Sequence, residues 1–128
     1  MAYSVMIVDD SPAMRKFMRR VMELTGIDTS EYREAGNGRE ALDQLRQKRV
    51  DLILTDINMP LMNGQQLIES LDADPDLRDI PVVVVSTDGS ASRVQRMLDL
   101  GAKGYVTKPF QPENLREELE RVLEEADA

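Results

Sequence analysis

Short apolar runs alternate along the chain with longer segments of helical periodicity. The runs lie at Val5 to Val8, Tyr32 to Ala35, Leu52 to Thr55, Val82 to Val85 and Gly104 to Val106. This alternation is typical of βα units built around a parallel sheet. The first, third and fourth runs are almost continuously apolar, which predicts central strands covered on both faces. The run that begins at Tyr32 is short and polar, so we expect it at an edge.

Each run is followed by the signals of an amphipathic helix. Ser11 can cap the first helix, Pro12 suits its first turn and Gly26 can end it. The later helices are expected from about Arg39 to Lys48, after Gly64, between Ser90 and Gly101, and from Pro112. Periodicity places these side chains inward: Met14, Phe17, Met18, Val21 and Met22 in the first helix, and Val94, Met97 and Leu98 in the fourth. The pattern predicts an α/β fold that forms a single domain over residues 1–128, with no output domain.

Composition narrows the chemistry that this domain can perform. The 128 residues include no cysteine and no histidine, which excludes disulfides, thiolate nucleophiles and a Ser-His-Asp triad. The formal net charge of -8 argues against nucleic acid as a partner. There is no cationic leader and no apolar run of membrane-spanning length, so we expect a soluble cytoplasmic protein without a membrane partner.

Polar residues gather where the predicted strands end. Asp9 and Asp10 follow the first strand, Asp56 the third, Ser86 the fourth and Lys108 the fifth. Ligands of open parallel sheets bind at the carboxyl ends of the strands, and a strand order of 2-1-3-4-5 would bring the carboxylates together there. Carboxylates at close range repel one another, and a hard divalent cation such as Mg²⁺, Mn²⁺ or Ca²⁺ would offset this repulsion. Of these ions, Mg²⁺ best fits a site with few protein ligands. A carboxylate beside such an ion and a lysine can attack phosphorus.

The sequence resembles a response regulator receiver domain of two-component systems, and most resembles the stand-alone chemotaxis (CheY-like) type. The resemblance covers essentially the whole chain and rests on five segments in order. They are Val8-Asp9-Asp10-Ser11, Leu54 to Pro60 with Asn63-Gly64, Val84-Val85-Ser86, Gly101-Ala102, and Gly104 to Phe110. It implies a doubly wound, flavodoxin-like (βα)5 sandwich with a five-stranded parallel sheet of order 2-1-3-4-5 and helices on both faces.

The resemblance also implies a role for each site residue. Asp56 would be the phosphoacceptor. Mg²⁺ would be bound by Asp10, Asp56 and the backbone carbonyl of Asn58, with Asp9 acting largely through water. Lys108 would contact the phosphoryl group, and Ser86 would hydrogen-bond it after transfer. Whether the Lys108-Pro109 bond is cis is left open by the sequence.

Partners and regulation follow from the same resemblance. The donor would be a phosphohistidine on a sensor histidine kinase or a histidine phosphotransfer protein, in a chemotaxis pathway or another phosphorelay. The chain would be a signalling receiver rather than an enzyme, catalysing only its own phosphorylation and dephosphorylation. A downstream protein would bind the face of the fourth helix, fifth strand and fifth helix, which includes Val94, Tyr105 and Thr107, and Tyr105 would turn inward in the active state.

Three further residues would set the lifetime of the phosphorylated state. Thr87 stands where the family usually has Ala or Gly, which predicts narrower access to the phosphorus atom. Asn58 and Asp88 occupy positions that tune dephosphorylation in the family.

Two alternatives remain beside the switch. One is a degenerate receiver that acts as an unphosphorylated interaction module. The other is a dinucleotide-binding oxidoreductase, because the segment Gly36 to Ala41 matches G-x-G-x-x-A between a strand and a helix. The second is disfavoured because the preceding strand is polar and edge-like, whereas a cofactor crevice needs a central strand.

Overall fold

The computed structural model describes residues 2–127, which form five βα units. The strands are β1 (Tyr3–Val8), β2 (Thr29–Ala35), β3 (Leu52–Thr55), β4 (Val82–Ser86) and β5 (Gly104–Thr107). The helices are α1 (Pro12–Thr25), α2 (Gly38–Gln47), α3 (Gly64–Asp72), α4 (Ala91–Leu100) and α5 (Pro112–Asp127). All strand pairs are parallel and the order is β2-β1-β3-β4-β5, which confirms the predicted fold class.

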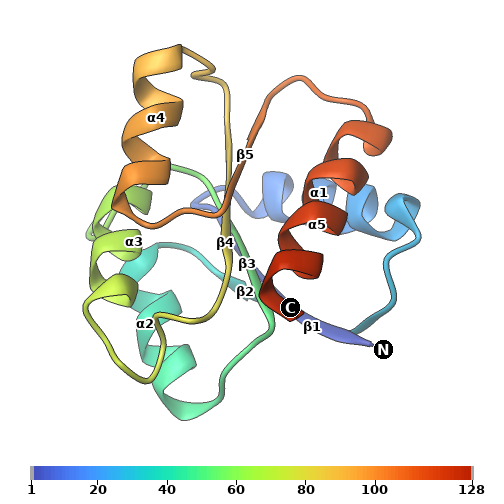
Figure 1. The fold of residues 1–128 in the computed structure, drawn as a ribbon. Coiled ribbons are helices and arrows are strands. Elements are labelled where there is room, and N and C mark those ends of the chain that lie inside the picture. The colour runs from blue at the N-terminus through green and yellow to red at the C-terminus, as the bar shows by residue number, and fades with distance from the viewer. Residues whose placement is uncertain (1, 128) are drawn as a thin grey trace.

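The sheet is the middle layer of a three-layer sandwich. Helices α2, α3 and α4 cover one face and α1 and α5 cover the other (Figure 1). Each interface is an apolar cluster, since alternate strand residues point to opposite faces: Met6 and Ile53 pack under α2 to α4, whereas Ile7 and Leu54 pack under α1 and α5. This double cover explains why β1, β3 and β4 are so uniformly apolar.

Helix boundaries follow the signals in the sequence. The Ser11 hydroxyl accepts a hydrogen bond from the Met14 N–H at 3.2 Å, and Gly26 ends α1 with a left-handed φ of 77°. Ser90 precedes α4 but makes no side-chain cap. Strand β2 is at an edge as predicted, although it begins at Thr29 and is not short: its seven residues make it longer than any other strand among residues 2–127.

Two side chains predicted to point inward do not. Phe17 is 50 % exposed and Leu98 is 37 % exposed, whereas Met18, Met22 and Met97 are buried. Both exposed residues lie near the margin of the apolar stripe, where a small rotation of the helix about its axis decides whether a side chain meets the sheet.

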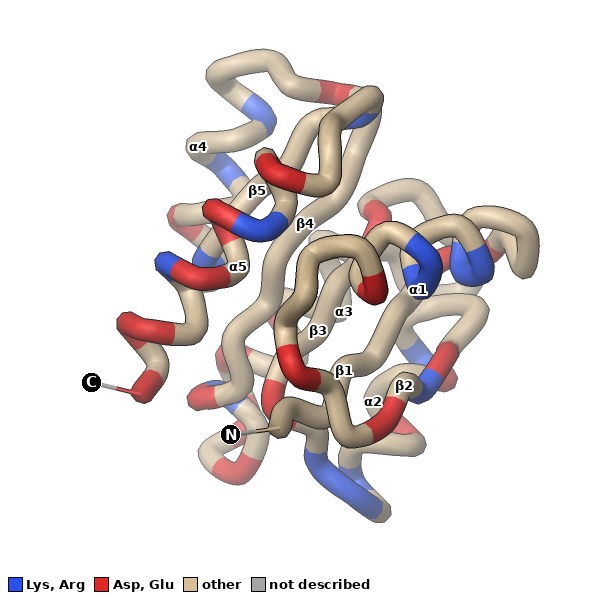
Figure 2. The backbone as a smooth tube through the Cα atoms, turned by 90° about the vertical axis from the view of Figure 1, so that its right-hand side faces the viewer, with Lys and Arg blue, Asp and Glu red and all other residues tan. Residues whose placement is uncertain are grey.

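Charge is distributed unevenly over the helices that cover the second face. Acidic bands dominate along α5, whereas basic bands cluster on α1 (Figure 2). The arginines of α5 pair with glutamates one turn away, so this helix has the solvated, ion-paired surface expected of an exposed face. In the described part of the chain, no helix combines the length and the apolar character needed to cross a bilayer.

Candidate functional site

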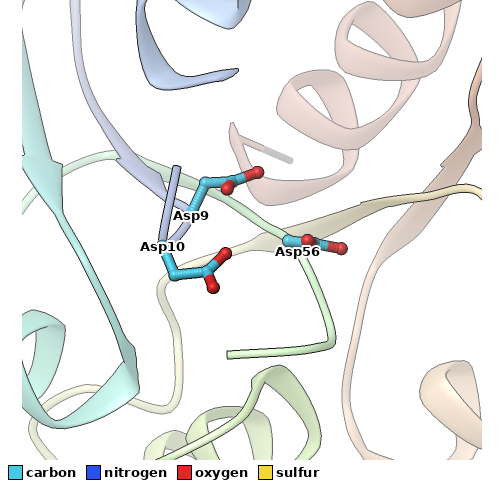
Figure 3. Close-up of side chains that lie close together, drawn as sticks. All are labelled: Asp9, Asp10 and Asp56. Carbon is cyan, nitrogen blue, oxygen red and sulfur yellow. The ribbon is translucent and has the colours of Figure 1, made fainter. Parts of the chain in front are cut away.

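Three carboxylates meet at the carboxyl ends of β1 and β3. Asp9 and Asp10 directly follow β1, and Asp56 directly follows β3, the neighbouring strand. One oxygen from each lies within 4.8 Å of the others, and the three side chains extend into the same region (Figure 3). Backbone pairing holds the two strand ends together, because the Asp56 N–H donates to the Val8 carbonyl at 3.0 Å at the end of the parallel β1–β3 ladder.

Asp9 is the buried member of this cluster, with 4 % of its surface exposed. Its Oδ1 accepts the Ser11 N–H at 2.9 Å, and its Oδ2 lies 3.9 Å from the Lys108 ammonium. Burial raises the pKa of Asp9 above its ordinary value, and the charge of Asp56 adds to this, while the Ser11 hydrogen bond and Lys108 oppose it. For Asp9, burial and the neighbouring carboxylate thus outweigh the opposing effects of the Ser11 hydrogen bond and Lys108.

The position of Asp56 is set by its immediate neighbours. Its Oδ1 accepts the N–H of Ile57 at 2.8 Å, which leaves the second oxygen free of hydrogen bonds to residues 2–127. Gly64 packs directly on the Asp56 backbone: a Cβ at position 64 would clash with the Asp56 carbonyl and stand 2.9 Å from the Ile57 Cα. Gly64 also donates its N–H to the Ile57 carbonyl at 2.8 Å, so the start of α3 holds the chain just beyond the phosphoacceptor candidate.

The structure brings Lys108 and Ser86 to the same end of the sheet. Asp9, Asp56 and Lys108 line one small cavity. The Lys108 N–H donates to the Ser86 carbonyl at 2.8 Å, and Ser86 is 2 % exposed at the end of β4. The Lys108-Pro109 peptide bond is cis, which the sequence left open.

The loop between β4 and α4 links Ser86 to β5. The Asp88 N–H donates to the Ser86 hydroxyl at 3.1 Å, and the Tyr105 hydroxyl donates to the Asp88 carbonyl. The ring of Tyr105 is half-buried against the apolar cluster under α2 to α4, and burial raises its pKa. The Tyr105 ring thus packs towards the core, and its role in the active state stays a prediction.

The remaining predicted residues lie around this site or on the predicted output face. Thr87, Asp88 and Asn58 are exposed, and the role of the Asn58 carbonyl stays a prediction. Val94 is half-buried on α4 and Thr107 is exposed on β5, which is an edge strand between α4 and α5. The face formed by α4, β5 and α5 is therefore continuous across this edge.

Two arginines make contacts near the site that no sequence pattern indicated. Arg15 donates to the backbone carbonyl of Asp9 at 2.6 Å, and Arg93 pairs with Asp88 at 3.4 Å. Both lie in the first turn of a helix, where an arginine is usually solvated. No spacing rule connects Arg93 to a loop residue before its helix, so only the folded arrangement reveals this contact.

The glycine-rich segment after β2 does not form a dinucleotide cradle. Strand β2 is an edge strand, whereas a cofactor crevice needs a central one. The space beside Gly38 is filled by Met62, whose Cγ would lie 2.8 Å from a Cβ at position 38, and the Gly38 N–H already donates to the Met62 carbonyl at 2.9 Å. The glycine permits the start of α2 to contact the loop before α3, rather than an approach of pyrophosphate.

The carboxylate cluster fits a hard divalent cation. Its donors are all oxygens, and one oxygen of each carboxylate lies within 4.8 Å of the others, so the three side chains could together hold one ion. Such a donor set suits Mg²⁺ or Mn²⁺ better than the softer transition metals.

Comparisons with known proteins agree with this geometry. The family model "Response regulator receiver domain" matches residues 5–120. A chemotaxis protein CheY homolog of Campylobacter jejuni is 38 % identical over 120 residues, covering 93 % of this chain and 91 % of the relative. Chemotaxis response regulator CheY4 of Vibrio cholerae superimposes with a TM-score of 0.82 at 31 % identity, covering 95 % of this chain and 99 % of that one.

A further solved structure is the Mn(2+)-bound form of response regulator Rcp1, with a TM-score of 0.76 at 28 % identity and coverage of 94 % and 91 % of the two chains. The matched region includes every strand end described above. The chain thus belongs to the response regulator receiver domain family, and it is a phosphorylation-activated signalling switch.

Proposed function

We propose that Asp56 accepts the phosphoryl group, from a phosphohistidine on a histidine kinase or phosphotransfer protein. The observation that carries the proposal is the meeting of Asp9, Asp10 and Asp56 within 4.8 Å at the strand ends, with Lys108 beside them. Asp56 is oriented for attack, because one of its oxygens accepts the Ile57 N–H and the other makes no hydrogen bond within residues 2–127.

In the transfer, the open oxygen of Asp56 attacks phosphorus and a new O–P bond forms. The bond between phosphorus and the donor's imidazole nitrogen breaks, and the imidazole leaves as a neutral ring after taking up a proton from solvent. The Lys108 ammonium stabilises the charge on the phosphoryl oxygens, and the Ser86 hydroxyl donates to one of them afterwards.

Mg²⁺ would be held by Asp10, Asp56 and the Asn58 carbonyl, with Asp9 acting through water. When bound, it would offset the negative charge that otherwise repels the incoming phosphoryl group. Support comes from the all-oxygen cluster and from the related response regulator Rcp1, whose solved structure is a Mn(2+)-bound form.

Intact-mass spectrometry after incubation with acetyl phosphate tests the site. We expect a gain of one phosphoryl group that requires Mg²⁺ and is lost in Asp56→Asn. Asp51→Asn is a matched control, because Asp51 lies at the opposite end of β3. No gain under rapid quenching, together with no binding of beryllofluoride, would favour the unphosphorylated interaction module instead.

We also propose chemotaxis as the pathway, with a downstream protein that binds the face formed by α4, β5 and α5. The names of the relatives in Campylobacter jejuni and Vibrio cholerae support it. Replacing the chromosomal gene with its Asp56→Asn variant should abolish chemotactic spreading in soft agar while leaving swimming intact. Normal spreading would point to a different phosphorelay.

A further inference from the structure

Asp88, in the loop between β4 and α4, is held by contacts to both its backbone and its side chain. Its N–H donates to the Ser86 hydroxyl at 3.1 Å and its carbonyl accepts the Tyr105 hydroxyl. Its Oδ1 accepts the Ser90 N–H at 3.1 Å, and its Oδ2 pairs with the Arg93 Nε at 3.4 Å. Asp88 therefore joins the end of β4, strand β5 and the first turn of α4.

In this arrangement the Ser86 hydroxyl can still donate a hydrogen bond to the phosphoryl group. A hydroxyl has one proton to donate and can accept at its oxygen. Because Ser86 accepts from the Asp88 N–H, its own proton is free to donate to a phosphoryl oxygen. The same loop position keeps Tyr105 turned towards the core. Contacts that hold Asp88 in place thus favour a loop that is ready for phosphoryl binding.

We propose that Arg93 is a positioning residue for the switch: its ion pair with Asp88 stabilises the loop arrangement in which Ser86 can donate to the phosphoryl group and Tyr105 lies inward. The inference rests on the proposed role of Asp56 and goes beyond it by naming a residue that touches neither phosphate nor metal. By linkage, whatever stabilises the binding-competent loop raises phosphoryl affinity.

The size of the effect follows from the exposure of the pair. The side chains of Arg93 and Asp88 are 39 % and 46 % exposed. The hydrogen bond from Ser90 is the main cause of the lowered pKa of Asp88, and the charge of Arg93 lowers this pKa further. The carboxylate is therefore ionised at neutral pH. Exposed pairs are weak, and their typical strength corresponds to a change in affinity of about two- to fivefold.

The test is a titration with beryllofluoride in saturating Mg²⁺, followed by ¹⁹F NMR, on the wild-type chain, Arg93→Gln and Arg96→Gln. Arg96 is a matched control because it is exposed on the same helix and makes no ion pair within residues 2–127. We expect Arg93→Gln to bind beryllofluoride about two- to fivefold more weakly than both other proteins.

A second arm separates the ion pair from a general structural effect. In 1 M NaCl the charges are screened, so the difference between Arg93→Gln and Arg96→Gln should disappear. Equal affinity of the two variants at low salt would overturn the proposal, and so would a difference that persists unchanged at high salt. If the wild-type chain itself binds no beryllofluoride, the proposed role of Asp56 fails first, which distinguishes the two outcomes.

Discussion

Gly64, at the start of α3, lies directly against the backbone of Asp56, at the end of β3. The contact is between main-chain atoms, so neither side can move away as a flexible side chain would. Through it, the packing of a helix start against a strand end fixes the position of the proposed phosphoacceptor.

Gly64→Ala should therefore destabilise the protein and disturb the site. The added methyl group would meet backbone atoms of Asp56 and Ile57, and such overpacking costs about 1–3 kcal/mol. Urea denaturation measures the free energy of unfolding, and acetyl phosphate labelling measures the site. Gln65→Ala, one residue later in the same helix turn, should change neither by much; an equally stable Gly64→Ala would show that the loop after β3 adapts freely.

The two faces of α1 should respond differently to truncation. Met22 is fully buried, so Met22→Ala removes core contacts and should cost about 2–5 kcal/mol. Phe17 is half exposed, and Phe17→Ala should cost clearly less. Chemical denaturation of both variants checks this difference. A Phe17→Ala protein as unstable as Met22→Ala would place the phenyl ring in the core, as periodicity alone predicted.

Asp9→Asn should stabilise the metal-free protein at neutral pH. The pKa of Asp9 is raised in the folded state, so its ionised form lowers stability above that pKa, and this penalty fades as the pH falls through it. In a chelating buffer at pH 7 we expect the melting temperature to rise by on the order of 2 °C.

Two controls sharpen the Asp9 experiment. Asp28→Asn removes an exposed carboxylate at the opposite end of the sheet and should have no such effect. Added Mg²⁺ should stabilise the wild-type chain more than Asp9→Asn, because a ligand that binds the folded state raises its stability. A lower melting temperature for metal-free Asp9→Asn would mean that the contacts to Lys108 and Ser11 outweigh burial.

We expect the hydroxyl of Ser86 to be needed for tight binding of the phosphoryl group. Ser86→Ala removes the donor for the phosphoryl group and leaves the Asp88 N–H without its acceptor, so beryllofluoride affinity should fall about tenfold. Ser86→Thr keeps the hydroxyl and should keep most of the affinity. Isothermal titration in Mg²⁺ measures both, and equal affinity of Ser86→Ala and wild type would remove Ser86 from the phosphoryl site.

Much of the fold was predictable because its signals are local. Ser11 and Gly26 mark the ends of α1, and the continuous apolar runs of β1, β3 and β4 identify strands with two covered faces. The candidate site was predictable as well, since residues that follow parallel strands must meet at one edge of the sheet. The bounds of β2 were harder to predict, because an edge strand carries polar residues and its sequence therefore resembles that of a loop.

The sequence by itself determined the order of βα units, the layers they build and the polar side chains that meet at the strand ends, because periodicity and capping act within a few residues. Only the tertiary structure decided that Phe17 is half exposed, that Gly64 packs on Asp56 and that Arg93 pairs with Asp88. These contacts join different elements, and their geometry depends on how each helix is rotated and placed against the sheet. That placement results from the packing of the whole core, so no local pattern of residues encodes it.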